Sequence, residues 1–270
     1  MENFSVGFII STYNNPDYLR KTLWGYCFQS RMADEIIIAD DGSKPQTKEM
    51  IEEEFSNILN INHVWHEDIG FRKTIILNKA LLASKSDYLI FTDQDCIPRN
   101  DFIETHCKYA QKGYFLSGGY FKLPISISKQ VTRQQIETQE LFSLKWLRAN
   151  GLPRSFKSTK LINKPWWSNL MNIITPTNAS WNGMNSSTWR ELLIKTKGFD
   201  SRMAYGGEDR ELGERLINSG IKSKQIRYSA ITLHLDHSRP YVNQEAWDIN
   251  NAIRKTTRKE HLTETQYGIE

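Results

Sequence analysis

The chain has 270 residues, of which 39% are hydrophobic and 24% charged, so a sizeable core is expected and disorder is excluded as the default state. Its 35 basic and 31 acidic side chains give a formal charge of +4, a balance too mild to indicate a nucleic-acid partner, and none is expected. The three cysteines show no CxxC spacing, which argues against a disulfide framework or a thiolate zinc site and favours a reducing compartment.

The first part of the chain alternates apolar, β-branched runs with stretches of helical spacing. The predicted strands are Phe4–Thr12, Glu35–Ala39, Asn62–His66 and Asp87–Thr92. One helix is predicted to begin after the turn Asn14-Asn15-Pro16, and two more are predicted over Thr47–Phe55 and Thr74–Ser84. This order predicts an α/β fold, Rossmann-like, with a mostly parallel sheet and flanking helices in a single domain. Ligands of such sheets bind beyond the carboxyl ends of the strands.

The pattern becomes irregular after about residue 113. Strands are predicted over Tyr114–Lys122 and Gln225–Leu233, and helices over Gln130–Arg148, Ser187–Lys195 and Glu208–Ser219. Three prolines and two adjacent tryptophans indicate that Asn150–Asn178 is a long, partly mobile loop. The polar tail Asn243–Glu270 is predicted to be helical with a loose end.

Two acidic pairs follow predicted strands. Asp93-Gln94-Asp95 places two carboxylates where one hard divalent cation could meet both, and carboxylate oxygens suit Mg²⁺ or Mn²⁺. Asp40-Asp41-Gly42-Ser43 could accept hydrogen bonds from a nucleotide base or ribose, with Gly42 allowing a tight turn. A solvated acidic turn is the alternative for each. Gly70-Phe71-Arg72-Lys73 offers cations near a helix start, which suits phosphate, although a solvated charge pair would look the same.

Two further segments carry titratable groups. In Tyr205-Gly206-Gly207-Glu208-Asp209 the glycines free the backbone before two acids that open a helix, where one acid could serve as a general base. The helix dipole alone also favours acids there. His234-Leu235-Asp236-His237 offers two imidazoles, one of which could complete a metal site, or one structural and one exposed histidine.

Taken together and in this order, these segments resemble the family 2 glycosyltransferases of the GT-A fold, over roughly residues 4–240. The likeness begins at Ile9-Ile10-Ser11-Thr12-Tyr13-Asn14 and continues through the acidic segments. The C-terminal part looks like a galactosyltransferase-type region, and the segments that carry this likeness are Trp181-Asn182-Gly183-Met184-Asn185, Gly198-Phe199-Asp200, Gly207-Glu208-Asp209 and His237-Ser238-Arg239. Gln94 in the middle of the DxD segment and the form of the Arg72 segment depart from the family pattern.

The resemblance implies an inverting, metal-assisted transfer of a hexose or N-acetylhexosamine from a UDP-sugar to a hydroxyl of a glycan or lipid-linked acceptor, as in polysaccharide assembly. The implied ligands of Mn²⁺ or Mg²⁺ are Asp95 and His237, with His234 as the alternative histidine. Asp209 is the implied general base, and Glu208 would bind donor or acceptor hydroxyls. The implied donor contacts are Ser11, Tyr13, Asp41, Arg72, Asp93 and Trp181, with Trp181 and Tyr205 as candidate sugar platforms.

The resemblance also suggests a division of labour. Residues 1–112 would form the nucleotide-sugar-binding half, residues 113–240 the half that holds the acceptor and the base, and residues 241–270 a helical tail. Two other functions fit parts of the pattern: a non-catalytic nucleotide-sugar or glycan-binding module, and a nucleotidyltransferase. The nucleotidyltransferase is disfavoured because the first turn, Ser11-Thr12-Tyr13-Asn14, lacks a Gly- and Lys-rich triphosphate loop.

The expected location is the cytoplasm. No apolar run approaches the roughly 20 residues that span a bilayer, and the first residues run into a strand pattern rather than a signal peptide. Peripheral association with the inner face of the membrane is the expectation if the acceptor is lipid-linked. The basic stretch 254–259 is flanked by acids, which is more typical of a solvated helix face than of a lipid site. The sequence leaves the oligomeric state open.

Overall fold

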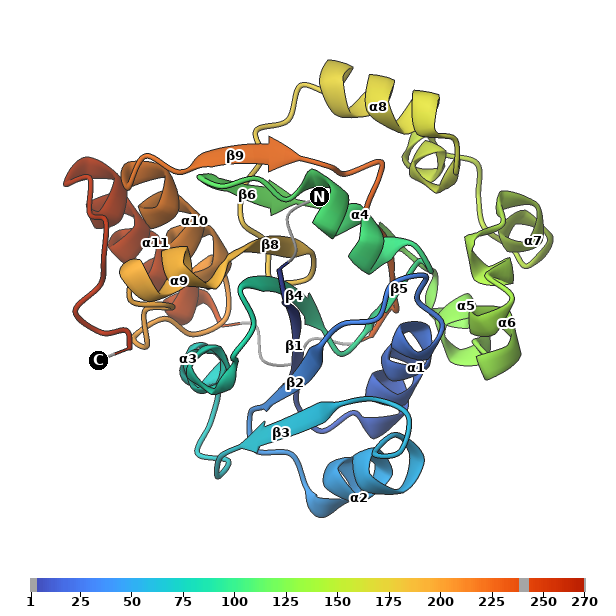
Figure 1. Ribbon diagram of the computed structural model, residues 1–270, viewed down its shortest axis with the longest axis horizontal. Helices are drawn as coiled ribbons and strands as arrows, with labels where there is room; N and C mark the ends of the chain where they lie inside the picture. The colour runs from blue at the N-terminus through green and yellow to red at the C-terminus, as the bar shows by residue number, and fades with distance from the viewer. Residues whose placement is uncertain (1–3, 238–242, 270) are drawn as a thin grey trace.

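A seven-stranded sheet forms the centre of the molecule (Figure 1). The computed structural model describes residues 4–237 and 243–269. The strands, in their order across the sheet, are β3 (Ile61–Trp65), β2 (Glu35–Asp40), β1 (Val6–Thr12), β4 (Tyr88–Asp93), β8 (Ser186–Trp189), β6 (Tyr114–Ser117) and β9 (Lys222–Gln225). The first four strands run parallel, whereas β8 is antiparallel to both of its neighbours. The predicted α/β architecture, single-domain and mostly parallel, is confirmed.

Helices cover both faces of this sheet because successive strand residues point to opposite sides. Phe8 and Ile10 face one core cluster, while Ile9 between them faces the other. The helices on the first face are α1 (Pro16–Cys27), α2 (Pro45–Glu54) and α4 (Phe102–Tyr109). Those on the second face are α3 (Lys73–Ala83), α9 (Arg190–Lys195) and α10 (Glu208–Asn218), and α11 (Gln244–Lys259) packs against α10.

A second, three-stranded sheet lies beside the first and is followed by a chain of short helices that rims the molecule (Figure 1). Its strands, in order, are β5 (Cys96–Pro98), β10 (Ile231–His234) and β7 (Gly119–Lys122). The rim consists of α5 (Ile125–Gln130), α6 (Arg133–Glu137), η1 (Glu140–Phe142), α7 (Leu144–Ala149), η2 (Phe156–Leu161) and α8 (Pro165–Ile174). A separate apolar core joins this sheet to the rim. In the described ranges, no helix is both long and apolar enough to cross a membrane.

Several predicted elements of the second half are wrong in detail. Residues 150–178 are not one loop, because they contain η2 and α8. The helix predicted over Ser187–Lys195 begins as strand β8, and the one predicted over Gln130–Arg148 is broken into short pieces. The strand predicted over Tyr114–Lys122 divides between the two sheets at Gly118, where a Cβ would lie 1.9 Å from Asn185 Oδ1. Within Gln225–Leu233, the strand β10 begins only at Ile231.

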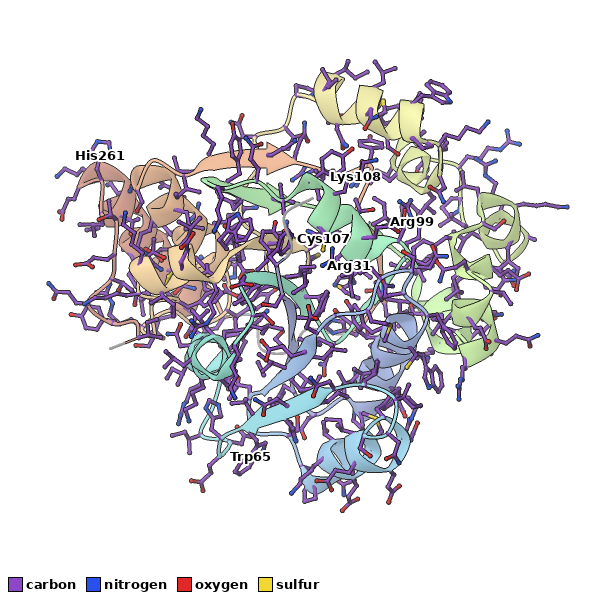
Figure 2. All side chains as sticks on the ribbon, viewed as in Figure 1. Arg31, Trp65, Arg99, Cys107, Lys108 and His261 are labelled. Carbon is purple, nitrogen blue, oxygen red and sulfur yellow. The ribbon has the colours of Figure 1, made fainter. Side chains whose placement is uncertain are left out.

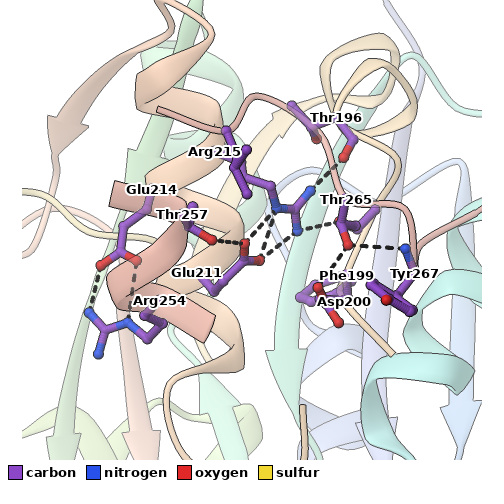
Figure 3. Close-up of polar contacts among 12 residues, drawn as sticks. Thr196, Phe199, Asp200, Glu211, Glu214, Arg215, Arg254, Thr257, Thr265 and Tyr267 are labelled. Carbon is purple, nitrogen blue, oxygen red and sulfur yellow. Dashed lines mark hydrogen bonds and ion pairs between the residues drawn. The ribbon is translucent and has the colours of Figure 1, made fainter. Parts of the chain in front are cut away.

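The end of the chain is packed rather than loose, up to the last described residue. Thr265 Oγ1 donates to Asp200 Oδ2 at 2.7 Å (Figure 3). The amide of Ile269 donates to the carbonyl of Lys197 at 2.9 Å, and the side chain of Ile269 joins the core against α3 and α10. The composition of the tail is polar, but a few apolar and hydroxyl side chains fix it to the second face of the sheet.

Candidate active site

The carboxyl ends of β1 and β4 bring two predicted site residues into contact. Parallel pairing sets Ser11 beside Asp93, and the Ser11 hydroxyl donates to Asp93 Oδ1 at 2.5 Å. Gln94, the departure in the middle of the DxD segment, accepts from the Thr12 hydroxyl at 2.5 Å and from the Tyr13 amide at 3.1 Å. The residue that departs from the family pattern therefore ties the two strand ends together.

Asp41 is the centre of a second polar group at the same edge of the sheet. Its Oδ1 lies 2.7 Å from His66 Nε2, and its Oδ2 accepts from the backbone amide of Arg72 at 3.0 Å. Burial raises the pKa of Asp41 above its ordinary value, although His66 and Arg72 oppose that shift. Asp41 and the backbone of Arg72 are thus neighbours. His66 was not expected there, and its position at the end of the third strand is the signal that could have found it.

Tyr13 has an accessible ring at this edge. Its side chain is 45% exposed, and its hydroxyl donates to Asp68 Oδ2 at 2.9 Å. The hydrogen bond to Asp68 raises the pKa of the phenol, so the group stays neutral. An exposed ring whose hydroxyl is fixed is a suitable stacking surface for a nucleobase.

Asp95, His234 and His237 form a compact cluster of possible metal ligands. Their ligand atoms all lie within 4.8 Å of one another. His237 Nε2 is 2.8 Å from Asp95 Oδ2, and His234 Nε2 is 3.4 Å from the same oxygen. Both histidines predicted as alternatives are therefore in the cluster. Of the matched segment His237-Ser238-Arg239, the last two residues lie outside the described ranges.

The chemistry of this cluster fits a divalent ion. Asp95 is buried, and burial opposes its ionisation, but His237 and His234 outweigh this and lower the pKa of the carboxyl. An ionised carboxylate is the form that binds metal. Mg²⁺ takes oxygen ligands, whereas imidazole nitrogen suits transition metals. One carboxylate with two imidazoles therefore suits Mn²⁺ better than Mg²⁺.

Glu208 and Asp209 are the first two residues of α10, and the residues just before them have a backbone conformation that favours glycine. Gly207 has a φ of +99°, in the left-handed region that favours glycine. The amide of Gly206 donates to Glu208 Oε2 at 2.8 Å. The amide of Gly183 donates to Asp209 Oδ2 at 2.9 Å, and a Cβ on Gly183 would come within 2.7 Å of this carboxylate.

The surroundings of Asp209 raise its pKa to about 7, mainly through burial and secondly through the negative charge of Glu208. Lys73 opposes the shift, and the Gly183 amide opposes it as well. The other oxygen, Oδ1, is buried and has no hydrogen-bond partner among the described residues. A carboxylate with a free oxygen and a pKa near neutrality has the properties of a general base.

Lys73 was expected, with Arg72, to be one of the cations that suit phosphate, and the structure pairs it with an acid. Its Nζ lies 2.7 Å from Asp93 Oδ1. Burial opposes its charge, but Asp93, Asp209 and Glu208 together raise its pKa well above the ordinary value. The charge of this one cation is therefore stabilised by acids of both the DxD segment and α10.

Trp181 does not have the sugar-facing position that the resemblance implied. Its side chain is fully buried and packs edge-on against Phe91 at 5.4 Å between ring centroids. This prediction is corrected, because a ring enclosed by the core beneath α10 has no face to offer a ligand. Tyr205 is half-buried beside Phe71, with 6.1 Å between ring centroids.

Comparison with solved structures defines the class of the fold. A mannosyltransferase from Pyrobaculum calidifontis, in complex with GDP-Man and Mn²⁺, has a TM-score of 0.57 at 18% identity, covering 93% of this chain and 61% of that one. The S. aureus protein TarS, in complex with UDP, has a TM-score of 0.53 at 16% identity, covering 87% of this chain and 59% of that one. The fold is that of the GT-A glycosyltransferases.

Sequence comparison places the chain within that class. The sequence profile of glycosyl transferase family 2 matches residues 8–177, and the chain belongs to this family. A chondroitin synthase from Escherichia coli is 26% identical over 238 residues, which cover 81% of this chain and 33% of that protein. A validoxylamine A glucosyltransferase from Streptomyces hygroscopicus subsp. jinggangensis is 24% identical over 239 residues, covering 82% of this chain and 53% of that protein. The chain thus spans about a third to a half of the length of these relatives.

Proposed function

We propose that this glycosyltransferase moves a hexose or N-acetylhexosamine from a UDP-sugar to a hydroxyl of a glycan or lipid-linked acceptor, with inversion at the anomeric carbon. The observation that carries the proposal is the set of charged groups around the end of β4: Lys73 Nζ lies 2.7 Å from Asp93 Oδ1, the charges of Asp209 and Glu208 also raise its pKa, and Asp95 of the same DxD segment belongs to the cluster with His234 and His237. A binding module would need neither a carboxylate with a pKa near 7 nor a cation stabilised by acids of two segments.

In this proposal the residues divide between donor and acceptor. Ser11, Tyr13, Asp41 and Arg72 lie on the side where the nucleoside would bind, with Tyr13 as the stacking ring. Asp209, held by the Gly183 amide, accepts the proton of the acceptor hydroxyl as that oxygen attacks the anomeric carbon opposite the leaving group. The bond to the nucleoside diphosphate breaks as the new glycosidic bond forms, so the configuration inverts without a covalent enzyme intermediate.

Asp95, His234 and His237 would hold the metal in this scheme. When bound, a divalent ion supplies positive charge that stabilises the departing diphosphate. Lys73 adds a second positive charge beside Asp93. The division into a donor half over 1–112, an acceptor half over 113–240 and a tail over 241–270 is part of this proposal, as is the galactosyltransferase-type nature of the C-terminal part.

The proposal is tested by thermal unfolding with UDP, GDP and CDP, each with and without Mn²⁺. A ligand at 100 times its Kd adds about 2.7 kcal/mol to the stability of the folded state. We expect UDP with Mn²⁺ to raise the Tm, and UDP alone to raise it less. Asp95→Asn is expected to abolish the effect of Mn²⁺, whereas Asp248→Asn, an exposed acid on α11, should leave it unchanged.

A panel of UDP-sugars, assayed for release of UDP in the presence of Mn²⁺, then identifies the donor. Failure of every nucleotide to shift the Tm in the presence of Mn²⁺ would overturn the donor site and favour a non-catalytic module. A Tm shift with GDP but not with UDP would keep the reaction and correct the donor.

A further inference from the structure

Helix α8 makes polar contacts on the side that faces the protein and exposes large apolar side chains on the side that faces solvent. Its inner side is attached to the protein by polar groups: Asn172 Nδ2 donates to Ser229 Oγ at 2.9 Å, and Asn172 Oδ1 accepts from the amide of Tyr228 at 2.9 Å. A cavity of about 100 Å³ lies on the same side, with Arg99, Lys108 and Ser168 in its lining. Figure 2 shows Arg99 and Lys108 near α4, below α8 in that view.

The outer side of α8 is apolar and solvent-exposed. Trp166, Leu170, Ile173 and Ile174 recur at the spacing of one helix face, and their exposed fractions are 63, 43, 80 and 56%. Phe156 in the preceding η2 is 69% exposed. α8 lies at the outer edge of the molecule (Figure 1). Isolated exposed apolar residues are ordinary, but a contiguous face of large side chains on one helix indicates an interaction surface.

Charge is segregated around this helix. Residues 141–190 contain no aspartate or glutamate, and the basic residues in that stretch are Lys145, Arg148, Arg154, Lys157, Lys160, Lys164 and Arg190. The rest of the chain has 28 basic and 31 acidic side chains. A protein that is nearly balanced overall therefore has one strongly basic stretch, and six of its seven cations directly precede α8.

These six cations lack anionic partners within the described part of the chain. None of them takes part in an ion pair there. Lys160 instead lies over the ring of Tyr120, 5.5 Å from its centroid. Burial lowers the pKa of Lys160, and the neighbouring cations Arg227 and Lys157 lower it further. Like charges held together without acids favour an anionic partner.

We propose that the outer face of α8, with Phe156 and the cations of residues 154–164, docks on an anionic lipid bilayer. An interfacial helix lies in the plane of the membrane, with Trp and aliphatic side chains at the acyl boundary and lysines or arginines against the headgroups. This surface is hereafter called the α8 surface. The proposal concerns binding and does not depend on which sugar is transferred.

The composition of the α8 surface decides between a bilayer and two other occupants. An acidic glycan would match the cations but has no apolar counterpart for Leu170, Ile173 and Ile174. A second copy of the chain, joined by a two-fold axis, would bury the apolar face but would bring the same cations of both copies together. Of these three occupants, an anionic bilayer is the one that matches both the aliphatic face and the positive charge.

The α8 surface is connected to the candidate active site through a short series of side chains. Lys160 Nζ donates to the carbonyl of Tyr120 at 3.3 Å, and the Tyr120 ring is 6.0 Å from that of His234. Docking would therefore bring the Asp95–His234–His237 cluster of the site close to the membrane. If the acceptor is lipid-linked, as the proposed function allows, its sugar would not need to leave the interface.

The test is co-sedimentation with vesicles of phosphatidylcholine alone and of phosphatidylcholine with about 30 mol% phosphatidylglycerol. We expect binding to the anionic vesicles that weakens as salt is added. Ile173→Ser with Ile174→Ser should weaken binding about tenfold or more, because two apolar side chains no longer enter the bilayer. Lys157→Glu with Lys164→Glu should weaken it by more than about tenfold, since each lysine near the surface contributes about fivefold.

A matched control distinguishes membrane binding through the α8 surface from nonspecific binding through any exposed apolar side chain. Ile58→Ser with Ile217→Ser removes two isoleucines of 53 and 49% exposure from other surfaces, and binding should stay at the wild-type level. Equal binding by the Ile173/Ile174 variant and the wild type would overturn the proposal, as would failure of the wild type to bind anionic vesicles. A concentration-dependent dimer in analytical ultracentrifugation that the Ile173/Ile174 variant abolishes would overturn it in favour of self-association.

Discussion

Asp209 receives a hydrogen bond from Gly183 on one oxygen, while the other oxygen is buried without a partner. Replacement by asparagine removes the carboxylate and keeps the shape. We expect Asp209→Asn to lower the transfer rate about 10²–10⁴-fold, the usual contribution of a general base, while UDP binding in a thermal-shift assay persists.

Asp248→Asn serves as the control for Asp209→Asn, because that carboxylate is exposed on α11. Near-normal transfer by Asp209→Asn would show that another group takes the proton. Loss of UDP binding together with transfer would instead indicate a donor-binding role.

The raised pKa of Asp209 predicts a dependence of stability on pH. In the folded protein this pKa is about 7, against an ordinary value of 3.8. Between these values the folded state holds more protons than the unfolded state, so the free energy of unfolding falls as pH rises. Relative to Asp209→Asn, we expect the metal-free wild type to lose on the order of 1–4 kcal/mol between pH 4 and pH 7.

Urea unfolding of the two proteins across this range measures that difference. A difference that does not change with pH would mean that the carboxyl titrates at its ordinary value in the folded protein.

The helix that carries Asp209 is held by a buried ion pair (Figure 3). Arg215 is fully buried on α10 and donates to both oxygens of Glu211, and its remaining donors bind the carbonyls of Thr196 and Gly198. Thr257 of α11 donates to Glu211 Oε1 at 2.8 Å. This network joins α9, α10 and α11 beneath the site.

We expect Arg215→Met to lower the free energy of unfolding by about 3–5 kcal/mol, because it leaves Glu211 buried without its cation. Arg258→Ala is the matched control. Arg258 of α11 pairs with Glu214 of α10, the helix that carries Arg215, but its side chain is 53% exposed, so its loss should cost less than about 1 kcal/mol. Denaturant unfolding of both variants measures the difference. Similar, small losses for the two would show that Arg215 does not stabilise α10.

At this scale the sequence predicted the first half of the fold well, because apolar runs such as Glu35–Ala39 are unambiguous buried strands. It failed at β8, where Ser186–Trp189 is buried on both sides although half of it is serine. It failed again at α8, where nearby prolines indicated a loop. Arg215 and Glu211 have the spacing of an exposed helical pair, and only tertiary packing reveals that they are buried.

For the candidate site, too, the sequence predicted the features that depend on local pattern and not those that depend on contacts distant in the chain. Strand ends located Ser11, Asp41, Asp93 and Asp95, because the edge of a parallel sheet follows from the alternation of elements. The enclosure of Trp181 depends on residues distant in the chain. The effect of Asp209 on the charge of Lys73 also acts between residues 136 positions apart in the chain. No periodic pattern records such contacts.

For the whole molecule, the last residues close the face of the sheet beneath α9 and α10. Ile269 is 7% exposed in that core, and the Ser201 amide donates to the carbonyl of Tyr267 at 2.9 Å. Removing residues 264–270 should therefore lower the free energy of unfolding by about 2–5 kcal/mol, as loss of a buried isoleucine alone would. We expect a fall in Tm of roughly 4–20 °C.

Differential scanning fluorimetry measures this fall in Tm, with Ile269→Ala as a smaller step in the same direction. An unchanged Tm after the truncation would show that the tail is not part of the cooperative unit.

The pairing of β5 with β10 has a consequence for the order in which the protein is made. Asp95 precedes β5, whereas His234 ends β10, and β10 is the only partner of β5 in the described sheets. At about 5–20 residues per second, the histidine leaves the ribosome roughly 7–30 s after the aspartate. Throughout that interval the nascent chain contains the acids but not the two histidines. The strand β5 has no partner, and an unpaired strand edge can promote aggregation. If the cluster binds a metal as proposed, capture of that metal would have to wait until both histidines have been synthesised and β10 has paired with β5.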